Sequence, residues 1–543
     1  MEYSNRRLPR LAFLPLFCLA ASVLLAQSSG FDVLIAGAKV VDGSGAPWFY
    51  ADVAIKGDTI ASIGPPSGAT AAVRIDAAGL IVAPGFIDVH SHGAGGGPFY
   101  PGPGGIFDVP SAENYLREGV TTIVEGPDGY SPLPIASLLD RVSRTPISIN
   151  FATLVGQGSI RQEVIGLANR KASAEEIDRM KALAATAMRD GAFGLSTGLF
   201  YVPGSYTPTE EIIDLAKVVG RMGGIHISHM REETSHVLES VRETIRIGEE
   251  AGLPTQITHH KIVGKDNWGK SVDTLRLVEE ARARGVDVTL DQYPYTASST
   301  GLYVLLPQWA LEGGRQATRK RLASTDDRHR IKAAIVNSLQ FDRGGGDPKN
   351  VVIASCDFDP NVAGKTLADL TRARSVEPSF ENSAETVIAL EERGDCAAVY
   401  HAMSEDDVRR IMRSPYTMIG SDGIIPVFGH GAPHPRSYAT FARVLAVYVR
   451  ETKVLTLEEA VRKMSGFPAQ RLKMWDRGTL RPGMKADVVL IDPEAIADRA
   501  TFDKPHQYAT GVRDVIVNGR IVLRNGTVTQ ERPGRVLYGP GRE

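Results

Sequence analysis

The stretch "FIDVHSH" (Phe86–His92) is an apolar run that ends in two histidines separated by one residue. Side chains in a β-strand alternate between its two faces, so His90 and His92 point in the same direction. Two imidazoles that converge at the end of a strand favour a metal site. The alternative is a pair of ordinary polar residues at a strand-to-loop junction, and the rest of the chain decides between the two.

The middle of the chain repeats this strand pattern with helices in between. Strand-like segments follow at 121–126, 147–156, 191–198, 224–230, 254–261, 287–294 and 416–423. One intervening segment, "SAEEIDRMKALAATAMRDG", has helical periodicity, begins with the capping-box pair Ser173 and Glu176, and ends at Gly191. This alternation predicts an α/β fold, a parallel (β/α)8 TIM-type barrel; an open doubly wound sheet is the alternative.

Segments outside the barrel pattern predict two further units. Both ends of the chain are rich in strands, as in "FDVLIAGAKVVDG" and "VRDVIVNGRIVLRNG", and predict a small β-sandwich formed from both chain ends. The long connection between the last two barrel strands predicts an inserted lid or subdomain over the barrel mouth. The expected boundaries are a signal peptide at 1–28, the N-terminal half of the β-sandwich at 29–85, barrel strands one to seven at 86–295, the insertion at 296–415, strand eight with the final helices at 416–474, and the C-terminal half of the β-sandwich at 475–543.

The N-terminus has the pattern of a secretory signal peptide. Basic "MEYSNRRLPR" precedes the apolar run "LAFLPLFCLAASVLLA". A membrane anchor is the alternative, but the run is short for a span and contains Pro15. We therefore expect export to the periplasm or beyond. After cleavage only Cys356 and Cys396 remain, and the default expectation is two buried thiols, with their pairing left open.

Composition limits the class of partner. Hydrophobic residues make up 43% of the 543 residues and charged residues 23%, which is ordinary for a globular protein. The formal net charge of -2 gives no reason to expect nucleic acid or an anionic membrane as partner. We expect a small-molecule substrate and no stable membrane insertion after signal cleavage; the sequence leaves the oligomeric state unknown.

Metal-type ligands cluster where barrel strands end, which is where a barrel carries its functional residues. The candidates are His90 and His92 after strand one, Glu125 and Asp128 after strand two, His229 after strand five and His259 after strand six. The strand-one pair would hold one zinc position and the other two histidines a second, with a carboxylate from the strand-two loop as bridge. His259 is preferred over His260 because strand alternation places it on the same face as Lys261.

Further polar residues suit catalysis and substrate binding. Asp422 in "GSDG", after strand eight, is placed to act as general base on water beside the metal. Tyr201, after strand four, could donate to a developing oxyanion; a packing aromatic is the alternative. Four residues could bind a negatively charged substrate, with solvated surface as the alternative: Lys261, Tyr293, Tyr295 and Arg436.

At these positions the sequence resembles the amidohydrolase superfamily and, within it, the N-acyl-D-amino-acid deacylases (D-aminoacylases). The motifs that carry the resemblance are "PGFIDVHSH", "GLSTGLFYVPG", "ISHMREE", "ITHHK", "DQYPY", "MIGSDG" and "HPRSYATF". It implies the barrel, the sandwich from both termini and zinc-dependent amide hydrolysis, with one or two Zn²⁺ ions per chain. It further implies that His229 and His259 hold the tightly bound metal and that His90 and His92 hold the other. Asp422 would be the acid/base, and Tyr201 would assist at the carbonyl. The substrate carboxylate would be bound by Lys261, a tyrosine of "DQYPY" and Arg436.

The strand-two loop departs from the family pattern. The family commonly has a cysteine ligand there, in a motif like "GNCG", whereas this chain has "GPDG" with Asp128 at that position. Glu125, three residues earlier, competes for the role. Strand three has Gln157 where relatives often have histidine, and strand four lacks a lysine, which argues against a carbamylated-lysine bridge. A hard carboxylate in place of a soft thiolate should alter the metal preference.

The expected reaction is therefore hydrolysis of the amide bond of an N-acyl-amino acid, of D configuration according to the resemblance. Three alternatives remain. A dipeptidase acting on D-residue-containing peptides would use the same chemistry. A cyclic amidase of the hydantoinase or dihydroorotase kind would often need the missing lysine. A secreted binding protein without catalysis would have lost Asp422 or a ligand, and all are present.

Overall fold

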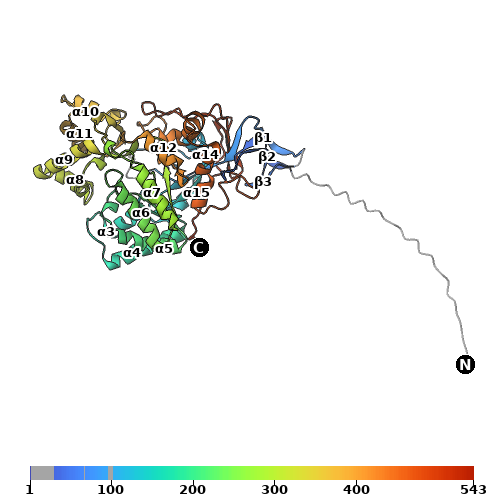
Figure 1. The fold of residues 1–543 in the computed structure, drawn as a ribbon, viewed down its shortest axis with the longest axis horizontal. Helices are drawn as coiled ribbons and strands as arrows, with labels where there is room; N and C mark the ends of the chain where they lie inside the picture. The colour runs from blue at the N-terminus through green and yellow to red at the C-terminus, as the bar shows by residue number, and fades with distance from the viewer. Residues whose placement is uncertain (2–29, 66–67, 96–101, 543) are drawn as a thin grey trace.

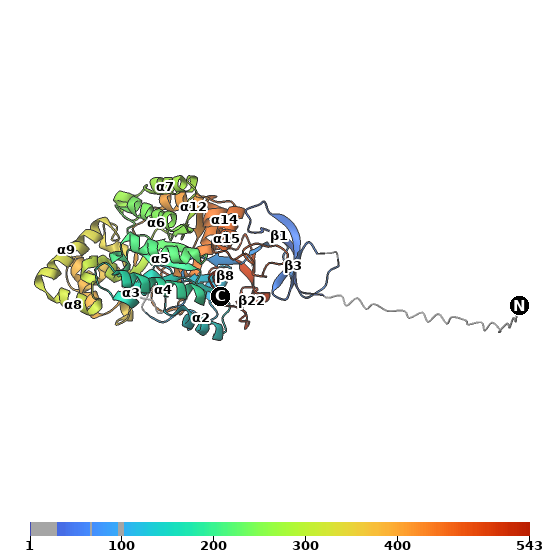
Figure 2. The ribbon, with the colours of Figure 1, turned by 90° about the horizontal axis from the view of Figure 1, so that it is seen from below.

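A computed structural model describes Met1 and residues 30–65, 68–95 and 102–542. The remainder of the predicted signal peptide, 1–28, lies outside the described residues. Within those described, no helix is both long enough and apolar enough to cross a membrane. Figures 1 and 2 both place β1 (Phe31–Val40) to β3 (Thr59–Ile63) at one end of the molecule and α8 (Arg315–Ala323) and α9 (Thr325–Phe341) at the other, with the barrel between them.

The centre of the molecule is a closed ring of parallel strands. In order they are β6 (Phe86–Asp88), β8 (Val120–Glu125), β9 (Asn150–Thr153) continued by β10 (Val155–Gly156), β11 (Gly194–Gly198), β12 (Ile225–His229), β13 (Thr255–Ile257), β14 (Val288–Gln292) and β18 (Thr417–Ile419). The ring closes where the Asp422 N–H donates to the His90 carbonyl (2.8 Å) and β19 (Gly423–Ile424) pairs in parallel with β7 (Ser91–His92). The predicted (β/α)8 barrel is confirmed.

Helices cover the outside of the ring, as the alternating pattern predicts. They are α1 (Glu113–Leu116), α2 (Ile135–Arg144), α3 (Gln157–Ile165), α4 (Ala174–Asp190), α5 (Thr209–Arg221), α6 (Val237–Ala251), α7 (Ser271–Ala283), α12 (Glu405–Arg413), α13 (Arg436–Arg443), α14 (Leu457–Met464) and α15 (Gly466–Arg471). The predicted capping box begins α4: the Ser173 hydroxyl accepts from the Glu176 N–H, and the Glu176 carboxylate accepts from the Ser173 N–H. Gly191 ends this helix with φ 119°, a conformation that favours glycine.

The two ends of the chain together form one nine-stranded sheet, at the end of the molecule that carries β1 to β3. Its strand order is β23-β22-β21-β20-β5-β1-β2-β3, with β4 beside β1. The strands not yet bounded are β2 (Phe49–Lys56), β4 (Ala71–Asp76), β5 (Ile81–Pro84), β20 (Val488–Ile491), β21 (Val512–Val517), β22 (Arg520–Arg524) and β23 (Thr527–Val528). N-terminal β5 pairs with C-terminal β20, which joins the two ends. β1 pairs with β4 along its first residues and with β5 along its last, so the sheet divides there around its own apolar core.

The insertion between β14 and β18 has its own core. A three-stranded antiparallel sheet, β15-β17-β16, packs with helices. The elements not yet bounded are β15 (Ser298–Gly301), β16 (Val351–Cys356), α10 (Leu367–Ala373), α11 (Phe380–Arg393) and β17 (Cys396–Tyr400). Ser298, Ser299 and Thr300 of β15 line a small cavity together with residues of the barrel mouth. The insertion therefore covers the mouth, where the candidate ligands lie.

The default expectation of two buried thiols is wrong. Cys356 and Cys396 lie opposite one another on the antiparallel strands β16 and β17 and are joined by a disulfide, with a Cα–Cα distance of 4.1 Å. The pairing depends on the register of two strands that are far apart in the sequence, which neither cysteine reveals on its own.

Replacing both cysteines, Cys356→Ser with Cys396→Ser, should lower the free energy of unfolding by about 2–4 kcal/mol, because the crosslink restricts the unfolded chain. Denaturant unfolding measures the difference. Alkylation of the unreduced, denatured wild-type protein is the companion assay: neither thiol should react until a reductant is added. Reaction of both thiols without reductant would contradict the disulfide.

Candidate metal centre

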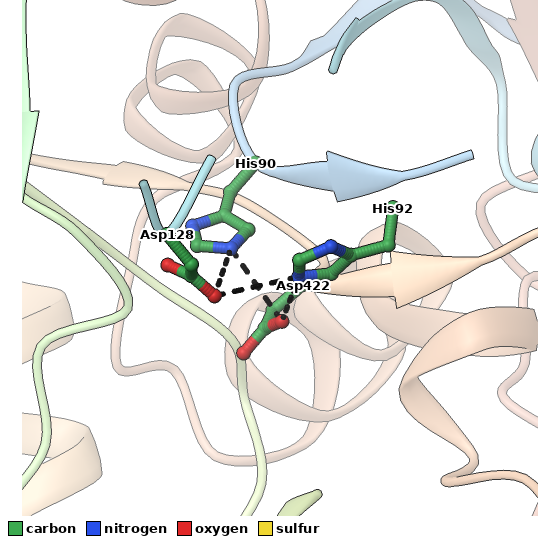
Figure 3. A group of neighbouring side chains, drawn as sticks. All are labelled: His90, His92, Asp128 and Asp422. Carbon is green, nitrogen blue, oxygen red and sulfur yellow. Dashed lines mark ion pairs between the residues drawn. The ribbon is translucent and has the colours of Figure 1, made fainter. Parts of the chain in front are cut away.

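Four side chains converge at the barrel mouth from two neighbouring strand ends and one loop (Figure 3). Asp422 Oδ1 lies 3.5 Å from His90 Nε2 and 3.2 Å from His92 Nε2. Asp128 Oδ2 lies 3.6 Å and 3.5 Å from the same two nitrogens. Zinc bonds of about 2.1 Å place tetrahedral ligand atoms about 3.4 Å apart, so this spacing suits one metal position.

The other oxygen of Asp128 faces a second pair of histidines. Asp128 Oδ1 lies 3.3 Å from His259 Nε2 and 3.6 Å from His229 Nδ1. These three residues form a second buried group of candidate ligands. Asp128 is thus the one carboxylate common to both groups, with one oxygen toward each histidine pair. This is the geometry of a bridging ligand between two metal positions.

Glu125 occupies a different place. It is buried, but its Oε2 accepts a hydrogen bond from the Ala94 N–H (2.9 Å), and it belongs to neither group of candidate ligands. Burial, the largest influence, raises the pKa of its carboxyl group. Glu125 therefore supports the loop that follows His92, whereas Asp128 points between the two pairs.

Three members of the two groups have an unusual backbone conformation. The φ angles are 56° at Asp128, 36° at His259 and 52° at Asp422. Residues with side chains rarely adopt positive φ, and each such residue costs on the order of 1–3 kcal/mol. Each of the three follows a barrel strand, so the turn directs the side chain inward over the mouth of the barrel.

The donor set fits a metal ion. Among the described residues, His90 Nε2, Asp128 Oδ1 and His229 Nε2 are buried without a hydrogen-bond partner. A buried polar atom without a partner costs about 1–3 kcal/mol, and a bound cation would satisfy the first two of these atoms. Burial and the nearby Lys261 cation lower the pKa of His259 to about 3, so its imidazole is neutral, which is the form that binds a metal. Imidazole and carboxylate together suit zinc.

Glu233 supports the second histidine pair from behind, and the sequence reasoning missed it. Its Oε1 lies 3.4 Å from His259 Nδ1, whose hydrogen-bond partner is Lys261 Nζ (2.7 Å), and its Oε2 lies 4.0 Å from His229 Nε2. The same carboxylate accepts hydrogen bonds from Lys261 Nζ (2.5 Å) and Arg343 Nη2 (3.0 Å). Burial opposes its ionisation, but the surrounding cations hold the pKa of Glu233 well below its usual range. Glu233 therefore places a negative charge 3.4 Å behind the His259 ring and 4.0 Å behind the His229 ring, which would make both imidazoles better ligands.

Glu233 and Arg343 differ in how the sequence could have revealed them. Glu233 lies four residues after His229 within "ISHMREE", so the motif already contained it. Arg343 comes from the insertion, after α9, in a stretch without strand pattern or motif. Only the folded chain brings it to the barrel mouth.

Of the four residues predicted to bind substrate, Lys261 lines the small cavity at the candidate ligands, and the other three do not. Lys261 also bonds to Glu233. Arg436 Nη1 pairs with Asp422 Oδ2 (2.8 Å), and its guanidinium carbon lies 4.7 Å from the centre of the Tyr293 ring. The Tyr295 ring lies against His434 (5.1 Å between centroids), whose Nδ1 accepts from the Arg436 N–H.

Tyr201 lies beside the second histidine pair. Its ring centroid is 4.7 Å from that of His229, and its hydroxyl is 3.1 Å from Thr300 Oγ1 of the insertion. Burial raises the pKa of the Tyr201 hydroxyl well above its usual value, so it keeps its proton. Gln157, by contrast, lies with its side-chain amide donating to Thr207 Oγ1.

Known proteins resemble this chain in fold and in sequence. The chain matches the Amidohydrolase family over residues 349–523. A D-aminoacylase of Alcaligenes xylosoxydans xylosoxydans is 36% identical over 94% of this chain and 98% of its own length. A solved D-aminoacylase, studied for its binuclear metal centre, has 35% identity and a TM-score of 0.78, covering 94% of this chain and all of the other. A solved N-acyl-D-glutamate deacylase of Bordetella bronchiseptica, with zinc and a phosphonate inhibitor that mimics the tetrahedral intermediate, has 33% identity and a TM-score of 0.79 over the same shares.

A parallel barrel with histidines and aspartates gathered at its mouth defines a metal-dependent amidohydrolase. With more than a third of its residues shared over nearly the full length of both chains, this chain belongs to the D-aminoacylase family of N-acyl-D-amino-acid deacylases.

Replacing Asp128 by asparagine should weaken metal binding by more than about 100-fold, since even an outer partner of a ligand contributes about 10–100-fold. The matched change Glu125→Gln should leave the metal content unchanged. Mass spectrometry of the metal content after dialysis measures both variants. If Glu125→Gln lost the metal and Asp128→Asn kept it, Glu125 and not Asp128 would be the metal ligand.

Glu233→Gln removes the charge behind His229 and His259 without changing shape. We expect metal affinity at that pair to fall by about 10–100-fold, measured by competition with a chelator. Glu232→Gln, at the neighbouring residue that bonds to His236, is the control and should bind metal as the wild type does. Equal affinity in all three proteins would show that Glu233 has no influence on the metal.

Proposed function

We propose that this protein hydrolyses the amide bond of N-acyl-D-amino acids with zinc as cofactor. The observation that carries the proposal is the pair of histidine sites that share Asp128 and adjoin Asp422 at the barrel mouth. When bound there, zinc polarises an amide carbonyl and lowers the pKa of water to about 7. His90 and His92 would hold one ion, His229 and His259 the other, and Asp128 both.

Asp422 is the proposed general base and acid. Its Oδ1 faces the strand-one histidines while its Oδ2 is held by Arg436. Burial opposes ionisation, but the Arg436 guanidinium and His90 hold the pKa of Asp422 well below its usual range, so it is a carboxylate at neutral pH. It takes a proton from the attacking water and delivers that proton to the nitrogen of the departing amino acid.

The remaining residues orient the substrate. Arg436, which pairs with Asp422, and Lys261, which lines the small cavity at the candidate ligands, would attract the free carboxylate of the amino acid. Tyr201 retains its proton beside His229 and would donate it as a hydrogen bond to the carbonyl oxygen as charge develops there. Holding the amide between these groups converts the attack into a reaction between fixed partners.

A cyclic amidase is the second candidate, and the ligand set disfavours it. β11, the fourth barrel strand, has the sequence Gly-Leu-Ser-Thr-Gly and offers no lysine for a carbamylated bridge. The place between the two pairs is taken by Asp128. A dipeptidase for D-residue-containing peptides would differ from the proposed enzyme only in the acyl group.

We also propose that the protein is exported. The basic and apolar segment at 1–28 supports this, and so does the disulfide between Cys356 and Cys396, since such bonds persist in oxidising compartments. In the native host, the purified protein should begin after the apolar segment and be found outside the cytoplasm. Edman sequencing and fractionation measure this; an intact Met1 on cytoplasmic protein would contradict it.

Asp422→Asn should lower kcat for N-acetyl-D-amino acids by about 100–10,000-fold, the usual contribution of a general acid or base. Since asparagine keeps an oxygen at the same place, the metal content should stay near that of the wild type. N-acetyl-L-amino acids are the control substrate and should be poor for both proteins. Full activity of Asp422→Asn would refute its role as general acid and base. Equal turnover of L and D substrates would refute the preference for the D configuration.

A further inference from the structure

A cavity of about 380 Å³ opens beside Asp128 and Tyr201, outside the small cavity at the candidate ligands. The barrel loops supply its near wall, including Tyr130 and Pro203, and the insertion supplies its far wall, including Tyr303 and Leu311. Insertion and barrel are joined next to it, where the Gly313 N–H donates to the Leu167 carbonyl (3.3 Å). α3 and α8 accordingly lie near one another in Figures 1 and 2.

The position of this cavity relative to Asp422 indicates which half of the substrate it would bind. Asp422 must lie at the departing nitrogen, so the amino-acid half occupies the side of Asp422 and Arg436. In the proposed deacylase reaction, the scissile carbonyl would lie between the histidine pairs. The acyl half then continues past Asp128 and Tyr201, which line the large cavity, whereas Asp422 does not.

The cavity is far larger than an acetyl group needs. A water molecule takes about 30 Å³ of the liquid, so this space equals that of about a dozen water-sized groups. Its walls include Tyr130, Leu167, Tyr303 and Leu311, which offer apolar surface to a chain of methylene groups.

Glu391, on α11, lines the same cavity with one carboxylate oxygen unsatisfied. Its side chain is buried, with 9% exposure of the residue, and Oε1 has no hydrogen-bond partner among the described residues. Two arginines line the same cavity: Arg315 pairs with Asp395 (2.5 Å), although its Nη2 has no hydrogen-bond partner among the described residues, and Arg319 Nη2 donates to the Arg393 carbonyl (3.3 Å). Burial, followed by the charge of Asp395, raises the pKa of Glu391 to about 8. A buried carboxyl group with an unpartnered oxygen is stabilised by a donor from a ligand, and a cation would favour its ionised form.

We propose, on the basis of the deacylase function above, that the large cavity is the acyl subsite and that Glu391 binds a primary ammonium group at the far end of the acyl chain. The substrate class is then D-amino acids whose nitrogen carries a long, amine-terminated acyl group, and acetyl derivatives occupy only the entrance of the subsite. Leu311 and Tyr303 contact the methylene portion, and Glu391 selects the end group.

The test compares kcat/KM for one D-amino acid carrying acetyl, ω-aminoacyl chains of increasing length, methyl-terminated chains of matched length and carboxylate-terminated chains. We expect the best amine-terminated chain to exceed its methyl-terminated match by about 10–100-fold, the usual range for a hydrogen bond to a charged group. Glu391→Gln should abolish this preference and leave acetyl turnover unchanged. Glu392→Gln, whose carboxylate pairs with Arg328 (2.7 Å), is the matched control and should behave as the wild type.

Leu311→Trp provides a second test that does not involve Glu391. Filling the cavity should reduce kcat/KM for the long chains by at least about tenfold relative to acetyl, the effect of a loss near 1.4 kcal/mol. Acetyl turnover without any gain from long chains, or a preference for carboxylate-terminated chains, would overturn the proposed subsite while leaving the deacylase function intact. Absence of turnover for every D-substrate, with metal bound, would refute the deacylase function itself.

Discussion

The site depends on one carboxylate placed between two pairs of imidazoles. Imidazole binds a metal in its neutral form, so four histidine ligands would supply no negative charge, and two divalent ions held close together would repel each other strongly in a buried site. Asp128 would oppose that repulsion, because each of its oxygens faces one pair at 3.3–3.6 Å from the ring nitrogens. The family pattern has a thiolate at this point. A carboxylate spans the two positions with separate oxygens and is a harder ligand, which favours harder metals than a thiolate does.

The insertion contributes to this site as well as covering it. Arg343 of the insertion and Lys261 of the barrel both bond to Glu233, and Glu233 faces the outer nitrogens of the second histidine pair. Thr300 of the insertion bonds to Tyr201. The insertion therefore supplies part of the positive charge around Glu233, behind the second histidine pair, as well as one wall of the mouth.

The barrel and the places of most candidate ligands could be predicted because both depend on local pattern. The closed barrel brings separate strand ends to one mouth, and His90 and His92 both lie there although the predicted strand is interrupted between Asp88 and Ser91. The choice between Glu125 and Asp128 could not be made this way, since it depends on a turn with φ 56° at Asp128. The disulfide and Arg343 depend on contacts of the insertion between residues far apart in the sequence. The contact between the Tyr295 and His434 rings likewise joins residues far apart in the sequence.

Anomalous diffraction at the zinc absorption edge, from crystals of the wild-type protein equilibrated with zinc, tests the role of Asp128 most directly. Two zinc peaks are predicted, one within bonding distance of His90 and His92 and one within bonding distance of His229 and His259, with a different oxygen of Asp128 bound to each. A single peak, or two peaks joined by another residue while Asp128 binds neither, would contradict the shared carboxylate.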